Sequence, residues 1–359
     1  MQFTYSHHLV GLVSRVEAAA TRVAAADPDR RAALVTPARR EAAVLSARLD
    51  GSPLTEATVA RVDGGAVPHL EHHSEADMGV GWARALKLDR METQQVAAVE
   101  YANLRGLPAV EDELAGTCLA EPLEVLRRLH GLICQGLVDP EVIGAWRRTE
   151  QAVHDGGQGM VIYNALPPER VAASMDQLAD WIRRRTLVLP PVVTVGVVHQ
   201  RLLEIHPFEA GNGRVARAFA RLVSRALALD PHGVAVPERQ LWADATGYYA
   251  EVAATMRRSG DLSLWLERHT GAMARALEAA ADDLDPRPVP ALPERGGPVV
   301  AELAPGRTTN LREYAKDAGV DLRTARQDLA AYARAGHLVE VPGGGGLVFQ
   351  RPPILRSEG

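Results

Sequence analysis

Aromatic residues are scarce in this chain, at 4% of 359 residues, although hydrophobic residues together make up 47%. We therefore expect a core built largely from alanine, leucine and valine. Cysteine is almost absent too, and Cys118 and Cys134 match no metal-ligand spacing. Both thiols are expected to be buried and reduced.

Lysine occurs only at Lys87 and Lys316, and the many arginines are spread along the chain and matched by acids, for a net charge of −5. This balance gives no overall attraction to nucleic acid or anionic lipid. The longest apolar stretch, 186–198, is interrupted by Pro190 and Pro191 and is too short to span a bilayer. The first eight residues have no basic start leading into an apolar run. We expect a cytoplasmic protein without a membrane span or a signal peptide.

The length exceeds one typical domain, so two or three folding units are expected. Most of the chain carries apolar residues at three- and four-residue spacing, which predicts helices. Such helices are expected over 39–49, 92–104, 123–134, 170–184, 193–204, 214–229 and 239–257.

One segment breaks the helical pattern. Residues 149–163 place the turn signal Asp155-Gly156-Gly157 between short apolar stretches. This pattern predicts a β-hairpin inside an otherwise helical domain.

The last part of the chain reads as a separate module. Residues 282–297 hold four prolines and a Gly-Gly pair, which is typical of a linker. Helices are predicted after it at 298–303, 310–317 and 322–335, followed by strand, Gly343–Gly346 turn and strand over 337–349. Three short helices and a two-stranded wing indicate a winged helix-turn-helix.

The most informative stretch runs from His206 to Arg217. A helix ends before His206, and Pro207 forces the chain out of helical geometry. The segment Gly211-Asn212-Gly213 then lets main-chain amides point into one concavity, and the next helix opens behind it. Amides at a helix N-terminus bind anions, most naturally a phosphate group.

Charged residues in the same stretch suit a polyphosphate. Arg214 and Arg217 lie three apart on one helix face, and His206 is placed to take a proton from a nucleophile. A Gly-Asn-Gly segment alone is usually a turn, and a lone histidine before proline is usually a helix end. All these features within twelve residues favour a phosphate site.

The stretch His206-Pro-Phe-Glu-Ala-Gly-Asn-Gly-Arg-Val-Ala-Arg217 resembles the signature of the Fic-domain family, His-Pro-Phe-x-(Asp/Glu)-Gly-Asn-Gly-Arg-x-x-Arg. The resemblance covers roughly residues 40–275 and implies an all-α core with a small β-hairpin flap. It implies that His206 deprotonates a target hydroxyl, which attacks the α-phosphate of a nucleotide. The implied nucleotide-binding residues are Phe208, Gly211, Asn212, Gly213, Arg214 for the β-phosphate, Arg217 for the γ-phosphate, and Tyr248 for the base unless it is a core residue.

One position departs from the signature. The family carboxylate that binds Mg²⁺ is replaced by Ala210, and Glu209 stands one residue earlier. Glu209 is a candidate metal ligand if the loop rotates, and a solvated loop acid is the alternative.

Two further segments acquire roles through the resemblance. The hairpin at 149–163 matches the flap on which a target protein would dock, against the alternative of a plain surface hairpin. Ser46-Ala-Arg-Leu-Asp50-Gly51 resembles the inhibitory motif (Ser/Thr)-x-x-x-Glu-(Gly/Asn), whose acid pairs with the second signature arginine, here Arg217. Asp50 is one methylene shorter than that glutamate, and the alternative is a plain helix end capped by Gly51.

The C-terminal module carries ten basic and nine acidic residues over 285–359, whereas a DNA-reading domain usually has a clearly basic face. An accessory or homodimerisation role is favoured over DNA binding.

Together these features predict an N-terminal helical region with the inhibitory helix at 1–110, a Fic core at 111–281, a linker at 282–297 and a winged helix-turn-helix at 298–359. The predicted activity is transfer of AMP from ATP to a Ser, Thr or Tyr hydroxyl of a target protein, with Mg²⁺ implied by the resemblance. The alternatives are transfer of UMP or phosphocholine, or a transcription regulator with a degenerate Fic core.

Overall fold

A computed structural model describes residues 2–70, 90–154, 161–185, 188–258, 260–285, 292–304, 306–335, 337–343 and 346–351. The chain divides into two compact units, 1–285 and 286–359. Each unit is described by itself.

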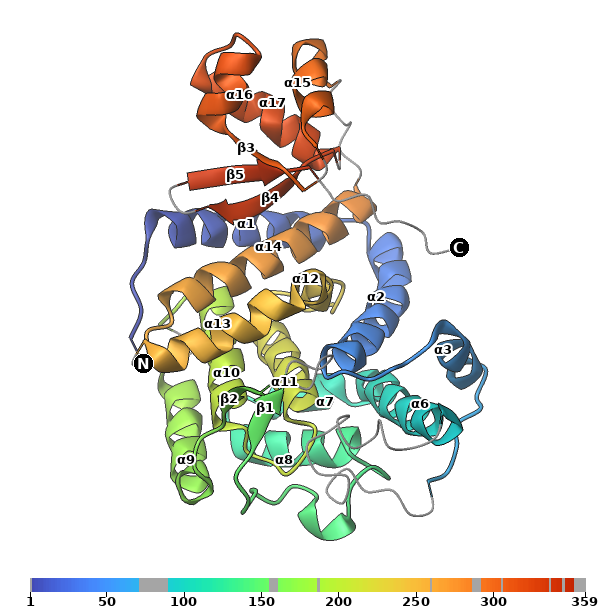
Figure 1. Ribbon diagram of the computed structural model, residues 1–359. Coiled ribbons are helices and arrows are strands. Elements are labelled where there is room, and N and C mark those ends of the chain that lie inside the picture. Colours follow the sequence, from blue (N-terminus) through green and yellow to red (C-terminus); the bar gives the residue numbers. More distant parts are fainter. Residues whose placement is uncertain are drawn as a thin grey trace. The chain divides into compact units, whose positions relative to one another are not determined.

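The first unit is helical (Figure 1). Its helices are α1 (His7–Ala25), α2 (Pro28–Leu49), α3 (Glu56–Asp63), α6 (Arg90–Gly106), α7 (Glu111–Thr117), α8 (Pro122–Ile133), α9 (Pro168–Arg185), α10 (Pro191–Ile205), α11 (Asn212–Ala226), α12 (Pro237–Ala243), α13 (Ala245–Arg257) and α14 (Ser263–Leu284), with single 3-10 turns at Leu107–Ala109 and Pro140–Val142. The all-α core predicted from the periodicity is confirmed. No helix in the described part of the chain is both long and apolar enough to cross a membrane.

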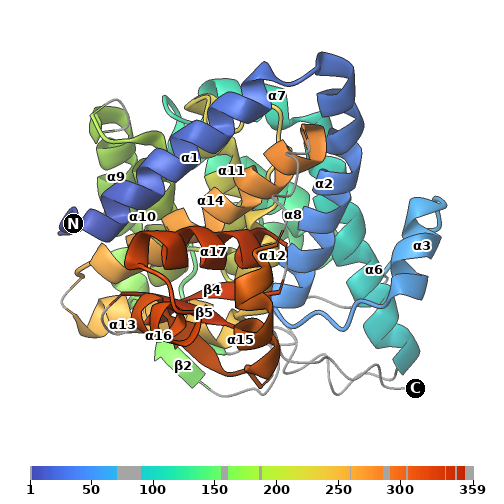
Figure 2. The same cartoon turned by 90° about the horizontal axis from the view of Figure 1, so that it is seen from above.

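Helices α10 and α11 lie side by side in the interior of this unit. Helix α11 also packs on α2, α7 and α8, whereas α10 packs on α9, α13 and α14. Helices α1 and α14 pack along each other as a long parallel pair, in which Arg15 contacts Glu278 and Arg22 contacts Asp282 (Figure 2). Helices α10 and α11 are therefore surrounded by other helices of the unit on most of their sides.

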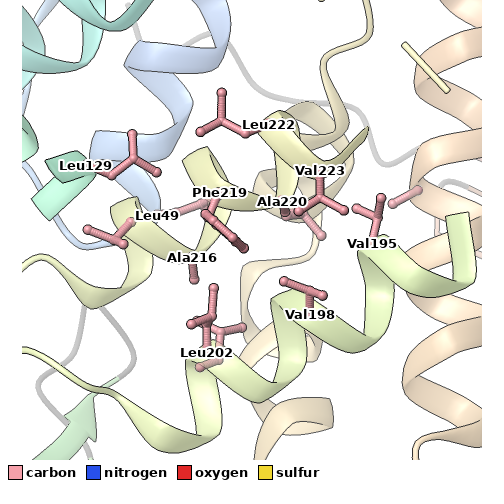
Figure 3. Close-up of a cluster of buried hydrophobic side chains, with 14 of the residues drawn as sticks. Leu49, Leu129, Val195, Val198, Leu202, Ala216, Phe219, Ala220, Leu222 and Val223 are labelled. Atoms are coloured by element: carbon pink, nitrogen blue, oxygen red, sulfur yellow. The ribbon is translucent and has the colours of Figure 1, made fainter. Parts of the chain in front are cut away.

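The contact between α10 and α11 is made by branched aliphatic side chains around Phe219. Val198 and Leu202 of α10 face Ala216 and Phe219 of α11, and Leu49 closes the cluster from the end of α2 (Figure 3). These side chains are buried, and full burial of each Val, Leu or Phe contributes about 1.5–3 kcal/mol. This packing fixes the end of α10 against the start of α11.

A close approach of α14 to α10 depends on Gly196. A Cβ atom on Gly196 would come within 2.8 Å of the Leu266 side chain and 3.1 Å of the His269 ring. The indole of Trp265 donates a 2.8 Å hydrogen bond to the carbonyl oxygen of Gly196. The missing side chain therefore lets an aromatic residue of α14 sit directly on the backbone of α10.

The single helix predicted over 239–257 is wrong. Two helices, α12 and α13, fill this range, and Asp244 separates them with φ −138° and ψ 62°. Its carboxylate accepts a hydrogen bond from the main-chain N–H of Gly247 at 3.0 Å, so Asp244 caps α13. The apolar spacing continues across the break, and a capping side chain decides the boundary.

The predicted hairpin corresponds to two short antiparallel strands, β1 (Ala152–His154) and β2 (Val161–Asn164). The register shifts between Val153 and His154, which indicates a bulge. The turn predicted at Asp155-Gly156-Gly157 lies outside the described residues.

The second unit contains a 3-10 turn at Glu294–Gly296, the helices α15 (Gly297–Glu302), α16 (Leu311–Asp317) and α17 (Leu322–Arg334), and the strands β3 (Thr308–Asn310), β4 (Val339–Gly343) and β5 (Gly346–Gln350). The sheet is antiparallel in the order β3-β5-β4, so it holds one strand more than the pattern indicated. A small core of its own surrounds Tyr314, Leu329 and Phe349. Within the range of the expected linker, 282–297, α14 continues to Leu284 and the 3-10 turn occupies Glu294–Gly296.

Several histidines of the first unit have a lowered pKa because the protein buries them. Burial lowers the pKa of His130, His206 and His269 to about 4, and that of His199 well below 6.5. In the folded state these imidazoles stay neutral at pH values where the unfolded chain takes up protons. The free energy of unfolding should therefore fall as the pH drops from 6.5 towards 4, by about 1.4 kcal/mol per pH unit for each histidine.

This predicts that His199→Gln makes the free energy of unfolding less dependent on pH. Urea unfolding of the variant at pH 7.5, 6 and 5 should give a shallower slope than the wild type, by about 1.4 kcal/mol per pH unit. His8→Gln, on the exposed side of α1, is the matched control and should keep the wild-type slope. Equal slopes for His199→Gln and His8→Gln would contradict the conclusion that burial lowers the pKa of His199.

Candidate active site

Helix α10 ends by turning His206 out of the helix. His206 has φ 52° and ψ 63°, in the left-handed region that residues other than glycine rarely adopt. Its ring atom Nδ1 lies 3.1 Å from the carbonyl oxygen of Leu203. Because a carbonyl oxygen can only accept, the imidazole proton is on Nδ1 and the lone pair is on Nε2. With a pKa of about 4 through burial, the ring is neutral at neutral pH and can accept a proton at Nε2.

The loop after His206 has a fixed shape. Gly211 has φ 70°, and a Cβ atom there would come within 2.5 Å of the Cys134 sulfur, so both the turn and the packing require glycine. Asn212 Oδ1 accepts from the main-chain N–H of Phe208 at 2.8 Å, and Asn212 Nδ2 donates to the Phe208 carbonyl oxygen at 2.7 Å. The Phe208 ring is buried and stacks on His130 at 4.1 Å. Phe208 and Asn212 therefore brace the loop.

Helix α11 begins at Asn212, and its N-cap residue, Gly211, has no side chain to cap it. The amides of its first turn have no carbonyl partner within the helix, and the helix dipole adds positive potential there. The carboxylate of Asp50, at the C-terminal end of α2, lies at this end. Its Oδ2 accepts from the main-chain N–H of Arg214 at 3.2 Å, and its Oδ1 packs directly against Gly213. An acidic side chain therefore occupies the anion position that the sequence predicts for phosphate.

Both signature arginines converge on Asp50. Arg217 Nη2 lies 2.7 Å from Asp50 Oδ1, and Arg214 Nε lies 3.5 Å from Asp50 Oδ2. Arg217 also donates from Nε to Ser46 Oγ at 2.9 Å and from Nη2 to the Ser46 carbonyl oxygen at 2.7 Å. Burial opposes the charge on Arg217, but the carboxylate of Asp50 outweighs it and raises the pKa of the guanidinium.

The end of α2 is shaped to deliver this carboxylate. Leu49 is its last helical residue and Gly51 follows in the left-handed conformation with φ 87°. The buried hydroxyl of Tyr249 donates a 2.6 Å hydrogen bond to the Leu49 carbonyl oxygen. Gly51 thus ends the helix, which agrees with the alternative interpretation of a plain helix end. Asp50 nevertheless also contacts Arg217, the partner that the resemblance to the inhibitory motif implies.

Glu209 is turned towards the segment that leads into β1. Its Oε1 accepts from the main-chain N–H of Arg148 at 2.8 Å, and its Oε2 accepts from Thr149 Oγ1 at 2.6 Å. Gln151 Nε2 donates to the Glu209 carbonyl oxygen at 2.5 Å. The side chain of Ala210 offers no donor atom for a metal.

These contacts do not provide the carboxylate that the resemblance implies for Mg²⁺. Both oxygens of Glu209 are held by protein donors, and a methyl group stands at position 210. Among the described residues, no cluster of three or more His, Cys, Asp or Glu side chains is arranged to hold a metal ion. The residues present do not fit a protein-held metal.

Tyr248 does not reach the surface. Its side chain has no exposed area, and its hydroxyl lies 3.1 Å from His199 Nε2, next to Trp265. The base contact suggested for Tyr248 has no accessible atom in this structure, because α13 turns the residue towards the interior. Tyr248 therefore lies where a core tyrosine would lie, which is the alternative interpretation given for it above.

Two charged residues near the site were not anticipated. Glu100 of α6 is fully buried, and its Oε1 lies 2.9 Å from Arg214 Nη1. Arg147 is also buried and donates to carbonyl oxygens around His206. The only signal for Glu100 is an acid inside the apolar run Val-Ala-Ala-Val-Glu-Tyr-Ala, and nothing in the sequence distinguishes Arg147 from the exposed arginines.

Known proteins resemble this chain in sequence and in fold. The Fic/DOC family profile matches residues 121–224. A segment of 222 residues is 26% identical to "Protein adenylyltransferase fic-1" of Caenorhabditis elegans, covering 58% of this chain and 39% of that protein. "Protein adenylyltransferase Fic" of Culex quinquefasciatus is 24% identical over 251 residues, covering 65% and 46%. The chain thus spans less than half the length of these curated relatives.

Solved structures agree on the fold. A Fic family protein from Desulfovibrio desulfuricans superposes with a TM-score of 0.60 at 19% identity, over 97% of both chains. A Fic domain containing signaling protein from Bacteroides thetaiotaomicron gives a TM-score of 0.54 at 17% identity, over 77% of this chain and 99% of that one. With the histidine, the glycine loop and the two arginines of the signature in place on this fold, residues 121–224 of the chain form a Fic domain.

Proposed function

We propose that this protein transfers AMP from ATP to a hydroxyl group of a target protein. The observation that carries the proposal is the neutral His206, whose Nε2 lone pair is available at the entrance of a loop that ends at the anion-binding start of α11. The names of the curated relatives, protein adenylyltransferases, support the same chemistry at 23–27% identity.

The proposed reaction assigns one task to each part of the site. His206 Nε2 takes the proton of the target hydroxyl, whose oxygen attacks the α-phosphorus of ATP. A bond from that oxygen to phosphorus forms, the bond from phosphorus to the β-phosphate oxygen breaks, and pyrophosphate leaves. The amides of Gly213 and Arg214 and the guanidinium groups of Arg214 and Arg217 hold the negative charge of the phosphates. No step is assigned to a metal ion.

The hairpin of β1 and β2 is the proposed docking place for the target protein. Val161 of β2 is 56% exposed, and a two-stranded sheet leaves main-chain groups on its outer edges. An extended segment of a partner can pair with such an edge, which would align its hydroxyl with His206.

We further propose that Asp50 inhibits the protein by taking the place of a phosphate. Asp50 contacts Arg217, the main-chain N–H of Arg214 and Gly213 together. The carboxylate therefore competes with phosphate for the same donors, and ATP affinity as well as reactivity is lowered.

We predict that His206→Ala abolishes transfer and leaves nucleotide binding measurable. The substitution removes the proton acceptor but leaves the loop and both arginines intact. Transfer is measured with α-labelled ATP as label on the protein itself or on lysate proteins, and binding by calorimetry. Transfer near the wild-type rate in the variant would exclude His206 from the mechanism.

We predict that Asp50→Ala raises transfer at least tenfold and tightens ATP binding. A charge-assisted contact of this kind contributes about 1.5–3 kcal/mol, which sets the size of the gain. The variant without ATP should be less stable than the wild type, because the buried guanidinium of Arg217 loses its carboxylate partner, while that of Arg214 keeps Glu100. ATP should restore its melting temperature.

The control for Asp50 is Glu56→Gln, which removes an equal charge from an exposed ion pair with Arg48. It should change neither transfer nor ATP affinity. If Asp50→Ala leaves both quantities unchanged while Arg217→Ala abolishes transfer, Asp50 is no inhibitor.

We predict that Ala210→Asp introduces a metal ligand that the wild type lacks. Calorimetric titration of Mg²⁺ into the ATP complex of the variant should show tighter metal binding than in the wild type. Ala210→Asn, which adds a neutral side chain of equal size, is the control. Equal Mg²⁺ affinity in all three proteins would show that position 210 does not face the phosphates.

A further inference from the structure

Arg147 holds the main chain on which His206 stands. Its side chain is 2% exposed, and its Nε donates to the His206 carbonyl oxygen at 2.5 Å. Its Nη2 donates to the carbonyl oxygens of Ile205, at 3.1 Å, and Leu166, while Nη1 donates to that of Thr149 at 2.6 Å. The main-chain N–H of Arg147 donates to the carbonyl oxygen of Pro207 at 2.9 Å. One residue thus binds three consecutive carbonyls, those of residues 205–207.

These contacts have a clear electrostatic reason. The last carbonyls of α10 have no partner within the helix, and the helix dipole makes them negative. The described hydrogen bonds of the Arg147 guanidinium all go to main-chain carbonyl oxygens rather than to a carboxylate. A buried cation with only neutral acceptors is costly unless the acceptors are many and fixed.

The same contacts hold His206 in a conformation that costs energy. A residue with a Cβ atom in the left-handed region is less stable by about 1–2 kcal/mol. In that conformation the ring meets the Leu203 carbonyl oxygen, which places the proton on Nδ1. The guanidinium on the carbonyl oxygens of Ile205 and His206 keeps the chain from relaxing to ordinary helical or extended geometry.

The position of Arg147 in the sequence connects this support to the hairpin. Residues 147–151 lead directly into β1, and Glu209 holds the same segment through Arg148 and Thr149. Residues 147–151 and 205–209 therefore lie against each other, joined by a buried guanidinium and a carboxylate. The strand pair and the histidine are thus anchored to one local piece of backbone.

We propose that Arg147 is a positioning residue for His206: it fixes the left-handed backbone that presents Nε2 as the proton acceptor. This rests on the proposed function of His206, and it predicts a loss in the rate of transfer with little loss in nucleotide binding. Arg147→Gln keeps one donor group and Arg147→Lys keeps the charge, but neither can serve four carbonyl oxygens at once.

The first test needs no activity. Long-range proton–nitrogen NMR of protein labelled with ¹⁵N-histidine should show the His206 ring as the Nδ1–H tautomer, assigned by the signal missing in His206→Ala. In Arg147→Lys and Arg147→Gln the signal should shift towards a mixture with the Nε2–H tautomer. A wild-type ring with its proton on Nε2, or an unchanged tautomer in both variants, would overturn the proposal.

The second test separates positioning from plain stability. With Asp50→Ala in the background, Arg147→Lys should reduce kcat at least tenfold per folded molecule, while the Kd for ATP stays within about threefold. The matched control is Arg148→Gln, since Arg148 is the exposed neighbour and its side chain makes no described hydrogen bond or ion pair. This variant should keep both values. Equal kcat in Arg147→Lys and the control would leave Arg147 a purely structural residue and overturn the proposal.

The two tests also separate this idea from the proposed function. If no variant, including Asp50→Ala alone, transfers label from ATP, the adenylyl transfer fails as a function. The tautomer measurement then still decides whether Arg147 positions His206.

Discussion

Two guanidinium groups buried beside the first turn of α11 are the constraint on which the site depends. Arg214 and Arg217 are each 2% exposed, and the helix N-terminus adds further positive potential next to them. Such a place is stable only if an anion occupies it, because an uncompensated buried charge costs several kcal/mol. In this structure Glu100 supplies one carboxylate to Arg214, and Asp50 supplies the other to both arginines. The same requirement is the physical basis of the phosphate binding that we propose for this place.

This requirement ties the N-terminal region to the loop that follows His206. Helix α2 ends with Asp50 over the start of α11, and both Ser46 and Tyr249 hold that end in place. Leu49 packs in the cluster between α10 and α11, so the end of α2 is part of the core as well as of the site. A phosphate that displaced Asp50 would therefore act on a packed helix end rather than on a loose segment. The first unit accordingly includes the N-terminal helices and the Fic domain in one body.

Glu209 illustrates how a departure from a family signature changes a residue's neighbours. With alanine at 210, the adjacent glutamate directs both of its oxygens to residues 148 and 149. The side of the loop that faces the hairpin is therefore fixed by a carboxylate, and its other side by Arg147. The loop, the histidine and the base of the hairpin therefore share one network of hydrogen bonds.

The sequence by itself determined the helical class, the positions of most helices and the composition of the site. Helical spacing is a local property, and the run from His206 to Arg217 holds its loop, cradle and charges within twelve residues. Only the tertiary structure decided which partners those residues have. Glu100 lies 114 positions before Arg214, Arg147 lies 59 before His206, and Asp50 lies 167 before Arg217. Periodicity showed neither that these charges are buried nor that Tyr248 is enclosed, because burial depends on which helices meet. The break at Asp244 was decided in the same way, by a capping contact that the apolar pattern does not record.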